Sequence, residues 1–268
     1  MNVQSYIQSM HLPIKDSHKG QNGKLLLIGG SELFHAASAW SLETASRIVD
    51  MVFYSSVPEN NELIHEAKKK FWDGVIVPRG EVQSYIDEAN CILIGPGMTR
   101  DGETATLTNM LLSKYAHKKW VIDAGALQMC DPSLLQENMI ITPHHGEFQR
   151  VFQKEAKTQD NVIECSKIHN NVVILLKGKE DIVVSGDRVE MVSGGNEGMT
   201  KGGTGDVLAG LVAALACTND LYTSAVVGSY VNKVAGDALY KNVGPFYNAS
   251  DLVKQLPQTM NELFFARE

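Results

Sequence analysis

Short apolar runs recur along the chain and alternate with segments whose apolar residues have helical spacing. Runs of this length that are rich in leucine and β-branched residues are typical of strands buried on both faces. Their alternation with helical segments indicates a largely parallel sheet with crossover helices. The predicted strands are residues 24–28, 51–55, 91–94, 120–122, 139–142 and 172–176. Each run ends at a turn, glycine or polar residue, and active sites of open α/β sheets gather at such strand ends.

The second half of the chain adds a hairpin and two helices. Residues 182–185 and 188–192 are joined by Gly186 and Asp187, which predicts a hairpin turn. Helical spacing then covers residues 204–217 and, roughly, 221–241, and the pattern predicts that these two helices close the chain. No repeat, low-complexity tract or Pro- and Ser-rich linker marks a boundary, so we expect a single domain over residues 1–268. The first twenty residues and those after residue 244 are expected to be peripheral.

Composition narrows the class of protein. Hydrophobic residues make up 44% of the 268, which is enough for a sizeable core. The net charge is −7 and no long basic run occurs, so nucleic acid is not an expected partner. The cysteines, which lack metal-finger spacing, are expected to be reduced and mostly buried. No apolar window approaches 18 residues and no leader pattern opens the chain, so we expect a cytoplasmic protein with no membrane partner.

The most informative segment is residues 199–210, where Gly202, Gly203, Thr204 and Gly205 precede an apolar helix. Glycines and the unpaired N–H groups of a helix start can direct several donors at one phosphate. Asp206 follows these donors, and its charge would repel a bound polyphosphate. A functional carboxylate at this position is therefore expected to abstract a proton from a hydroxyl group. A helix cap would explain one polar residue, but not three glycines in four positions.

A second candidate site follows the fifth predicted strand. Pro143 ends that strand, and His144 and Glu147 are three residues apart, so both can face one cleft across a helical turn. The alternative is a purely structural capping arrangement, with Thr142 as N-cap and Glu147 in the first turn. Two histidines at the carboxyl end of a strand favour function, and His144 and Glu147 are better candidates than His145.

Three other strand ends carry weaker signals. Gly95 and Gly97 flank a proline and would let a ligand approach the backbone, but a tight turn explains them nearly as well. Lys177 could neutralise a phosphate or be solvated. Asp123 could hold a cation or a ribose, or cap the helix that follows. Complete dinucleotide, P-loop, serine-nucleophile and zinc-protease motifs do not occur in the sequence.

Together these motifs resemble those of the ADP- or ATP-dependent NAD(P)H-hydrate dehydratase family, within the ribokinase-like superfamily. The resemblance covers about residues 20–240 and rests above all on Thr-Pro-His-x-Gly-Glu-Phe at 142–148 and Gly-Gly-Thr-Gly-Asp-Val-Leu-Ala-Gly at 202–210. It implies an α/β fold, a ribokinase-like three-layer α/β/α sandwich with a mostly parallel central sheet. It also implies a carbon-oxygen lyase that dehydrates the S-form of NAD(P)H hydrate to NAD(P)H. ADP would be converted to AMP and phosphate, or ATP to ADP and phosphate.

The resemblance assigns roles to individual residues. Asp206 would be the catalytic base that activates the hydroxyl group of the hydrate. The substrate would also be bound by Ala36, Gly97 and His144. The adenosine nucleotide would be bound by Lys177, Gly178, Lys179, Glu180, Asp181 and Gly205. The N–H groups of Gly202, Gly203, Thr204 and Gly205 would face the charge that develops on the phosphate. Glu147 is expected near Mg²⁺, directly or through water.

The nucleotide preference, the oligomeric state and the reaction itself have alternatives. It favours ADP over ATP and implies a homo-oligomer, a tetramer being one form. The chain departs from the family pattern at His35, around Asp50, at Gly125 and at Lys201. One alternative is a small-molecule kinase of the same superfamily, with Asp206 as base and a stable phosphorylated product. Another is a protein that senses nucleotides and has lost turnover, as the departures near His35 and Asp50 would allow.

Overall fold

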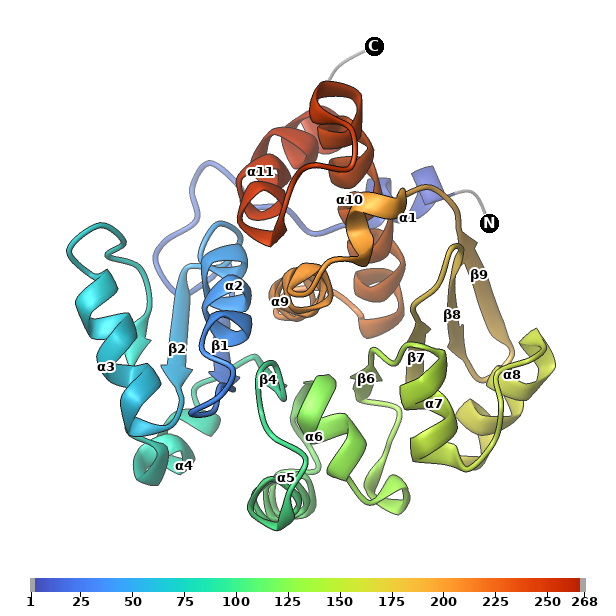
Figure 1. The fold of residues 1–268 in the computed structure, drawn as a ribbon, viewed down its shortest axis with the longest axis horizontal. Coiled ribbons are helices and arrows are strands. Elements are labelled where there is room, and N and C mark those ends of the chain that lie inside the picture. The colour runs from blue at the N-terminus through green and yellow to red at the C-terminus, as the bar shows by residue number, and fades with distance from the viewer. Residues whose placement is uncertain (1–2, 266–268) are drawn as a thin grey trace.

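The computed structural model describes residues 3–265 and has three layers, with helices on both faces of one nine-stranded sheet (Figure 1). The strand order is β3-β2-β1-β4-β5-β6-β7-β8-β9. Neighbours from β3 to β7 are parallel, and β7, β8 and β9 are antiparallel. The strands are β1 Lys24–Ile28, β2 Met51–Ser55, β3 Val75–Ile76, β4 Cys91–Ile94, β5 Lys119–Ile122, β6 Met139–Ile141, β7 Val173–Leu176, β8 Asp181–Ser185 and β9 Arg188–Val192.

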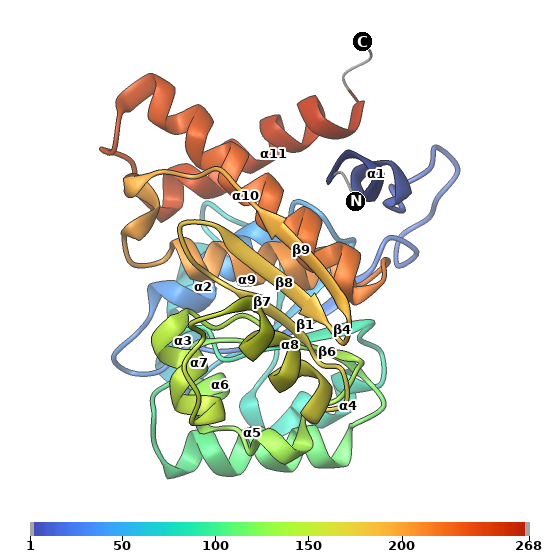
Figure 2. The same cartoon turned by 90° about the vertical axis from the view of Figure 1, so that its right-hand side faces the viewer.

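Eleven α-helices are described within residues 3–265, and they divide between the two faces of the sheet. They are α1 Val3–Ser9, α2 Ala36–Ala45, α3 Pro58–Ala67, α4 Val82–Ile86, α5 Gly102–Lys114, α6 Ala124–Met129, α7 His145–Phe152, α8 Gln159–Ile168, α9 Thr204–Ala216, α10 Leu221–Val243 and α11 Ala249–Phe265. Figure 2 shows α10 and α11 on one side of the sheet and α5 on the other. No described helix is both long and apolar enough to cross a membrane.

Strand alternation builds a separate core on each face. Along β1, Leu25 and Leu27 pack into the cluster that includes α9, α10 and α11, whereas Leu26 and Ile28 pack into the cluster on the other face. Successive side chains of a strand point to opposite faces, so a strand covered on both sides is apolar throughout. All four cysteines are buried and free, as the composition predicted.

The predicted strands, the hairpin and the two helices predicted at 204–217 and 221–241 are confirmed, with boundaries that differ by up to two residues. Three elements, α1, β3 and α11, were not predicted. The two-residue strand β3 is too short to leave a pattern. The prediction that α10 is the last helix is wrong, because α11 follows and packs against α10 and α2. Pro257 lies inside α11 and obscured its helical spacing, since proline removes a backbone donor. The expectation that residues after 244 are peripheral therefore fails for α11, whose Leu252, Val253 and Leu256 are buried. The same expectation for the first twenty residues fails for α1, which packs against α10 with Tyr6 and Ile7 buried.

Candidate functional site

The predicted site segments converge at the carboxyl ends of the central strands. The parallel ladder extends beyond the strands themselves, since Asp123 donates its N–H to Ile94 O and Lys177 donates its N–H to Pro143 O. These backbone bonds place Asp123 and Lys177 at one edge of the sheet, where the α9 N-terminus also lies. The order of strands β4, β5, β6 and β7 thus brings four distant sequence segments together.

Two cavities adjoin the start of α9. The larger cavity has a volume of about 550 Å³ and is lined by Lys177, Gly178, Lys179, Asp181, Gly194, Gly195, Asn196, Glu197, Met199, Thr200, Thr204, Gly205, Leu208, Asn232 and Lys233. The smaller cavity, of about 400 Å³, is lined by Phe34, Ala37, Gly97, Met98, Arg100, Ala124, Gly125, Gln128, His144, Gly146, Glu147, Arg150 and Asp206. Gly205 lines the larger cavity, and the next residue, Asp206, lines the smaller one. The first turn of α9 therefore separates the two cavities.

The glycine loop before α9 has a conformation that requires a glycine. Gly203 has a φ of 98°, and a Cβ there would lie 2.3 Å from a ring carbon of Trp40. The Thr204 hydroxyl ties the loop together by donating to Met199 O at 2.7 Å and Lys201 O at 2.9 Å. Gly203 is the N-cap residue and provides no side-chain cap, so neither Thr204 nor Asp206 caps α9. The Thr204 N–H donates to Lys201 O at 3.4 Å, and no side chain caps the helix start, where Thr204 and Gly205 line the larger cavity. A helix start without a capping side chain is suited to an anion.

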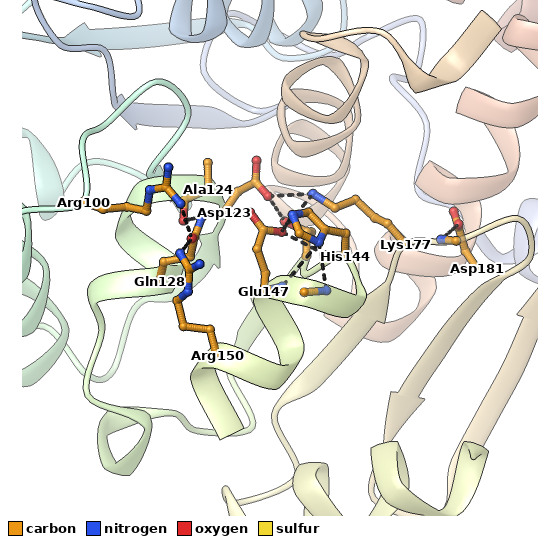
Figure 3. A network of polar contacts seen from close by, with 12 residues as sticks. Arg100, Asp123, Ala124, Gln128, His144, Glu147, Arg150, Lys177 and Asp181 are labelled. Atoms are coloured by element: carbon orange, nitrogen blue, oxygen red, sulfur yellow. Dashed lines mark hydrogen bonds and ion pairs between the residues drawn. The ribbon is translucent and has the colours of Figure 1, made fainter. Parts of the chain in front are cut away.

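Lys177 lies among the carboxylates of this edge (Figure 3). Its Nζ is 3.1 Å from Asp123 Oδ1 and 3.8 Å from Glu147 Oε2. Asp123 also accepts a hydrogen bond of 2.6 Å from Thr142 Oγ1. Asp123 is the N-cap residue of α6, but its side chain makes no capping hydrogen bond and contacts Lys177 and Thr142 instead.

The charges of this cluster set the protonation of Asp206. Burial, followed by the negative charge of Asp123, raises the pKa of Asp206 to about 7, although the positive charge of Lys177 opposes the rise. Burial disfavours the ammonium of Lys177, but Asp123 and Glu147 outweigh it and raise the pKa of Lys177 above its usual value. Lys177 thus remains charged, while Asp206 can take up a proton near neutral pH, the property required of a general base.

His144 and Glu147 form a capping box at the start of α7. The Nδ1 atom of His144 accepts from the N–H groups of Gly146 at 3.0 Å and Glu147 at 3.3 Å, and Glu147 Oε2 accepts from His144 N at 2.9 Å. The capping alternative was thus right about the arrangement but wrong about the residue, because the N-cap is His144 and not Thr142. Since Nδ1 accepts, a neutral His144 carries its proton on Nε2. The ring is 60% exposed, lines the smaller cavity and can donate there.

Most of the predicted substrate residues line the smaller cavity, but Ala36 does not. Gly97 approaches the neighbouring loop closely, because a Cβ on it would lie 2.8 Å from Phe34 O. Ala36 is exposed at the first residue of α2, and its neighbours Phe34 and Ala37 form the wall instead. His35 also lies outside the lining of both cavities, and its ring bonds to Asn60.

Of the other departures from the family pattern, Gly125 lines the smaller cavity, whereas Asp50 and Lys201 have contacts away from both cavities. Asp50 accepts from the N–H of Gly20 at 2.7 Å and of Asn22 at 3.0 Å, at the start of β2. Lys201 donates to Pro245 O. Neither Asp50 nor Lys201 lines either of the two cavities at the start of α9. The two departures that motivated a nucleotide sensor without turnover, His35 and Asp50, are therefore both outside the walls where chemistry would occur.

Five of the predicted nucleotide residues line the larger cavity, but Glu180 does not. Its carboxylate accepts from the hydroxyl of Ser193. Asp181 is buried and accepts from Gly178 N at 2.9 Å and from Ser229 Oγ at 2.7 Å. One oxygen of Asp181 thus binds the turn that begins at Gly178, and the other connects this turn to α10.

Lys233 was missed by the sequence analysis. It lies on α10, is buried, and is 3.3 Å from Asp181 Oδ1. Its ammonium donates to the carbonyls of Gly178, Lys179 and Gly194 at 3.2–3.3 Å. Lys233 thereby joins the two loops that form the walls of the larger cavity. The available signal was that Lys233 is the single charged residue in positions 221–236 of this helix, since lysine is rarely buried without partners.

Arg100, Gln128 and Arg150 were missed in the smaller cavity. Arg150 is three residues after Glu147, so the helical spacing of α7 could have placed both on one face. Arg100 follows the turn at Gly97, and only tertiary contacts reveal its neighbours.

Residues 25–258 match the sequence profile of a family described as NAD(P)H-hydrate dehydratase. A bifunctional NAD(P)H-hydrate repair enzyme of Methanocaldococcus jannaschii is 35% identical over 253 residues, which are 91% of this chain and 49% of the relative. The ADP-dependent (S)-NAD(P)H-hydrate dehydratase of Cenarchaeum symbiosum is 31% identical over 264 residues, which are 92% of this chain and 91% of the relative. The chain thus spans about half the length of its bifunctional relatives.

Solved structures share the fold. A ribokinase-like superfamily protein from Enterococcus faecalis has a TM-score of 0.88 at 24% identity, covering 98% of this chain and 95% of its own. The ADP/ATP-dependent NAD(P)H-hydrate dehydratase of Bacillus subtilis, co-crystallised with ATP and Mg²⁺, has a TM-score of 0.80 at 23% identity, covering 97% of both chains. The three-layer architecture is therefore ribokinase-like, as the motifs implied.

Proposed function

Because this chain belongs to the NAD(P)H-hydrate dehydratase family, we propose that it dehydrates the S-form of NADH hydrate or NADPH hydrate at the expense of ADP or ATP. ADP would give AMP and phosphate, and ATP would give ADP and phosphate. The observation that carries the proposal is that the consecutive residues Gly205 and Asp206 line different cavities. The nucleotide would occupy the larger cavity and the hydrate the smaller, so the terminal phosphate and the reacting hydroxyl group meet at one helical turn.

Asp206 would act as the base in this reaction. It takes the proton of the ring hydroxyl group while that oxygen attacks the terminal phosphorus and the bond to the nucleotide breaks. Phosphorylation converts hydroxide, a poor leaving group, into phosphate. The carbon–oxygen bond then breaks, a proton leaves the neighbouring carbon, and the ring double bond of NAD(P)H forms. A carboxylate with a pKa of about 7 is suited to the first step because it accepts a proton near neutral pH.

The groups around Asp206 would stabilise the charge that develops on the transferred phosphate. The N–H groups at the start of α9 have no side-chain cap and can donate to phosphate oxygens. Lys177 adds a positive charge that its two carboxylate neighbours hold in place. His144 would donate from Nε2 to the substrate across the smaller cavity.

The residues of the site fit a magnesium ion that is held mainly by the nucleotide. Within residues 3–265, no group of three or more His, Cys, Asp and Glu side chains is placed to hold a metal. Mg²⁺ usually binds through one or two carboxylates, several waters and substrate phosphates. Glu147, directly or through water, is the proposed protein partner, since its carboxylate lies beside Lys177 at the cavity wall. When bound, the ion would neutralise phosphate charge.

Two proposals concern the chain as a whole. The continuous nine-stranded sheet supports one domain over the chain. A homo-oligomer, expected from the resemblance, is tested by light scattering of the purified protein.

The test of the proposed function is a repair assay with chemically hydrated NADH and NADPH, run with Mg²⁺ and either ADP or ATP. We expect the near-ultraviolet absorbance of the reduced nicotinamide to return. Asp206→Asn should lower kcat by about 10²-fold or more, because the base is lost, while calorimetry still detects nucleotide binding. Asp220→Asn is the matched control, because Asp220 caps the start of α10 away from both cavities and asparagine caps equally well.

Two other outcomes would contradict the proposal. Phosphoryl transfer to hydroxymethylpyrimidine, thiazole or sugar alcohols, with no return of absorbance from either hydrate, would make the chain a small-molecule kinase. Nucleotide binding without either activity would make it a nucleotide sensor.

A further inference from the structure

Two arginines meet at one oxygen atom on the wall of the smaller cavity (Figure 3). Arg150, from α7, donates to Gln128 Oε1, and Arg100 Nη1 donates to the same oxygen at 3.4 Å. Arg100 lies in the loop between β4 and α5, whereas Gln128 lies on α6. Three separate elements therefore bring two positive charges to one place, and all three residues line the cavity that Asp206 also lines.

The orientation of Gln128 holds this arrangement. Its Nε2 donates to Glu147 Oε1 at 3.1 Å and to Ala124 O at 3.3 Å. Glu147 Oε1 and Ala124 O can only accept, whereas the two arginines can only donate. The Gln128 amide therefore satisfies all four contacts only with Nε2 toward the two acceptors and Oε1 toward the arginines. Gln128 thus connects the arginines to the capping box of α7.

In the part of the chain that the structure describes, the two positive charges have no carboxylate partner. Within residues 3–265, no carboxylate forms an ion pair with Arg100 or Arg150. Each guanidinium has five N–H donors, and the side-chain contact that is described for each uses one of them. Two guanidinium groups that contact the same oxygen repel each other, and an anion between them would relieve that repulsion. The pair is therefore suited to bind a group with several anionic oxygens.

We propose that Arg100 and Arg150 bind a phosphate group of the hydrated dinucleotide. This inference rests on the proposed function, because it places the substrate in the smaller cavity. Planar guanidinium groups match the oxygens of a phosphate and bind them through paired hydrogen bonds. The dinucleotide offers this chemistry at two places, the pyrophosphate bridge of both hydrates and the 2′-phosphate of NADPH hydrate. The arginines hold the phosphate end of the substrate while Asp206 faces the ring.

The experiment compares Arg100→Ala, Arg150→Ala and the double variant with the unmodified chain. Each single variant is expected to raise KM for the hydrate by about 10- to 100-fold, as is typical for loss of a charged hydrogen bond, with little change in kcat. Equal effects on the two hydrates identify the pyrophosphate bridge, whereas an effect on NADPH hydrate alone identifies the 2′-phosphate. Lys157→Ala, which removes an exposed charge outside both cavities, is the control and should leave KM unchanged.

A turnover-independent measurement separates this inference from the proposed function. The fluorescence of NADPH and NADH reports their binding even if the chain does not dehydrate the hydrates, and unchanged ADP affinity verifies that each variant is folded. Weaker binding of NADPH by the double variant supports the arginine site. Equal affinity of both reduced dinucleotides for the unmodified chain and the double variant overturns it. With an active enzyme, an unchanged KM for both hydrates overturns it equally.

Discussion

The pKa of Asp206 is raised first by burial and is then adjusted by two charged neighbours. Asp123 raises the pKa of Asp206 and Lys177 lowers it, although both also contact each other. The glycine loop indicates Asp206 in the sequence, but nothing local indicates that Lys177 and Asp123, 54 residues apart, form an ion pair. Removing either neighbour should therefore move the pKa of Asp206 in a direction known beforehand.

Asp123→Asn and Lys177→Met should displace the pH profile of kcat/KM in opposite directions. In the proposed mechanism activity requires deprotonated Asp206, so kcat/KM should rise with pH through the pKa of about 7. Asp123→Asn removes a repulsive charge, so the rise of kcat/KM should occur about one pH unit lower. Lys177→Met removes an attractive charge, so the rise should occur at higher pH by a similar amount. Profiles measured at saturating nucleotide, with Asp220→Asn as reference, test the pair. A shift of both variants in the same direction would contradict this account of the charges.

The glycine loop depends on elements that are far from it in sequence. Trp40 of α2 and Ala249 of α11 stand behind Gly203, and Trp40 Nε1 donates to Ser250 Oγ at 2.9 Å. The local sequence predicts a loop that can bind an anion. It does not reveal that Gly203 needs its positive φ and its lack of a side chain to fit against an indole ring.

Gly203→Ala should destabilise the fold, and Gly202→Ala should not. An alanine at Gly203 would have to adopt a φ of 98° and would clash with Trp40, whereas a Cβ at Gly202 has no neighbour within 4 Å. We expect Gly203→Ala to lower the free energy of unfolding by about 2 kcal/mol or more, and Gly202→Ala by less than about 0.5 kcal/mol. Thermal and urea unfolding measure both. Similar losses in the two variants would rule out the special role of Gly203.

The molecule as a whole has one sheet with a core on each face, and α11 completes one of these cores. Leu252, Val253 and Leu256 are buried against the cluster that includes α2, α9 and α10. The N-terminus of the same helix supports the glycine loop through Ala249. The last described helix thus contributes to both the stability of the core and the shape of the site.

Leu252→Ala should lower the free energy of unfolding by about 2–4 kcal/mol, because it leaves a cavity in the core. Phe246→Ala should have little effect, since Phe246 is 88% exposed just before α11 begins. Urea unfolding followed by circular dichroism compares the two. Equal stability of both variants would show that α11 contributes little to the core.

Local patterns were enough to predict every described strand except β3, the hairpin, the glycine loop and the family. Alternation, turn chemistry and motif spacing depend on neighbouring residues. They also placed Gly97, Asp123, His144 and Lys177 at strand ends, where a parallel sheet gathers its ligands. Only the tertiary structure joined Lys177 to Asp123, buried Lys233 between two loops and brought Arg100 to Arg150. Those contacts depend on the order of the strands and on how α6, α7 and α10 pack. Neither the strand order nor the packing of these helices can be read from residues that are neighbours in the sequence.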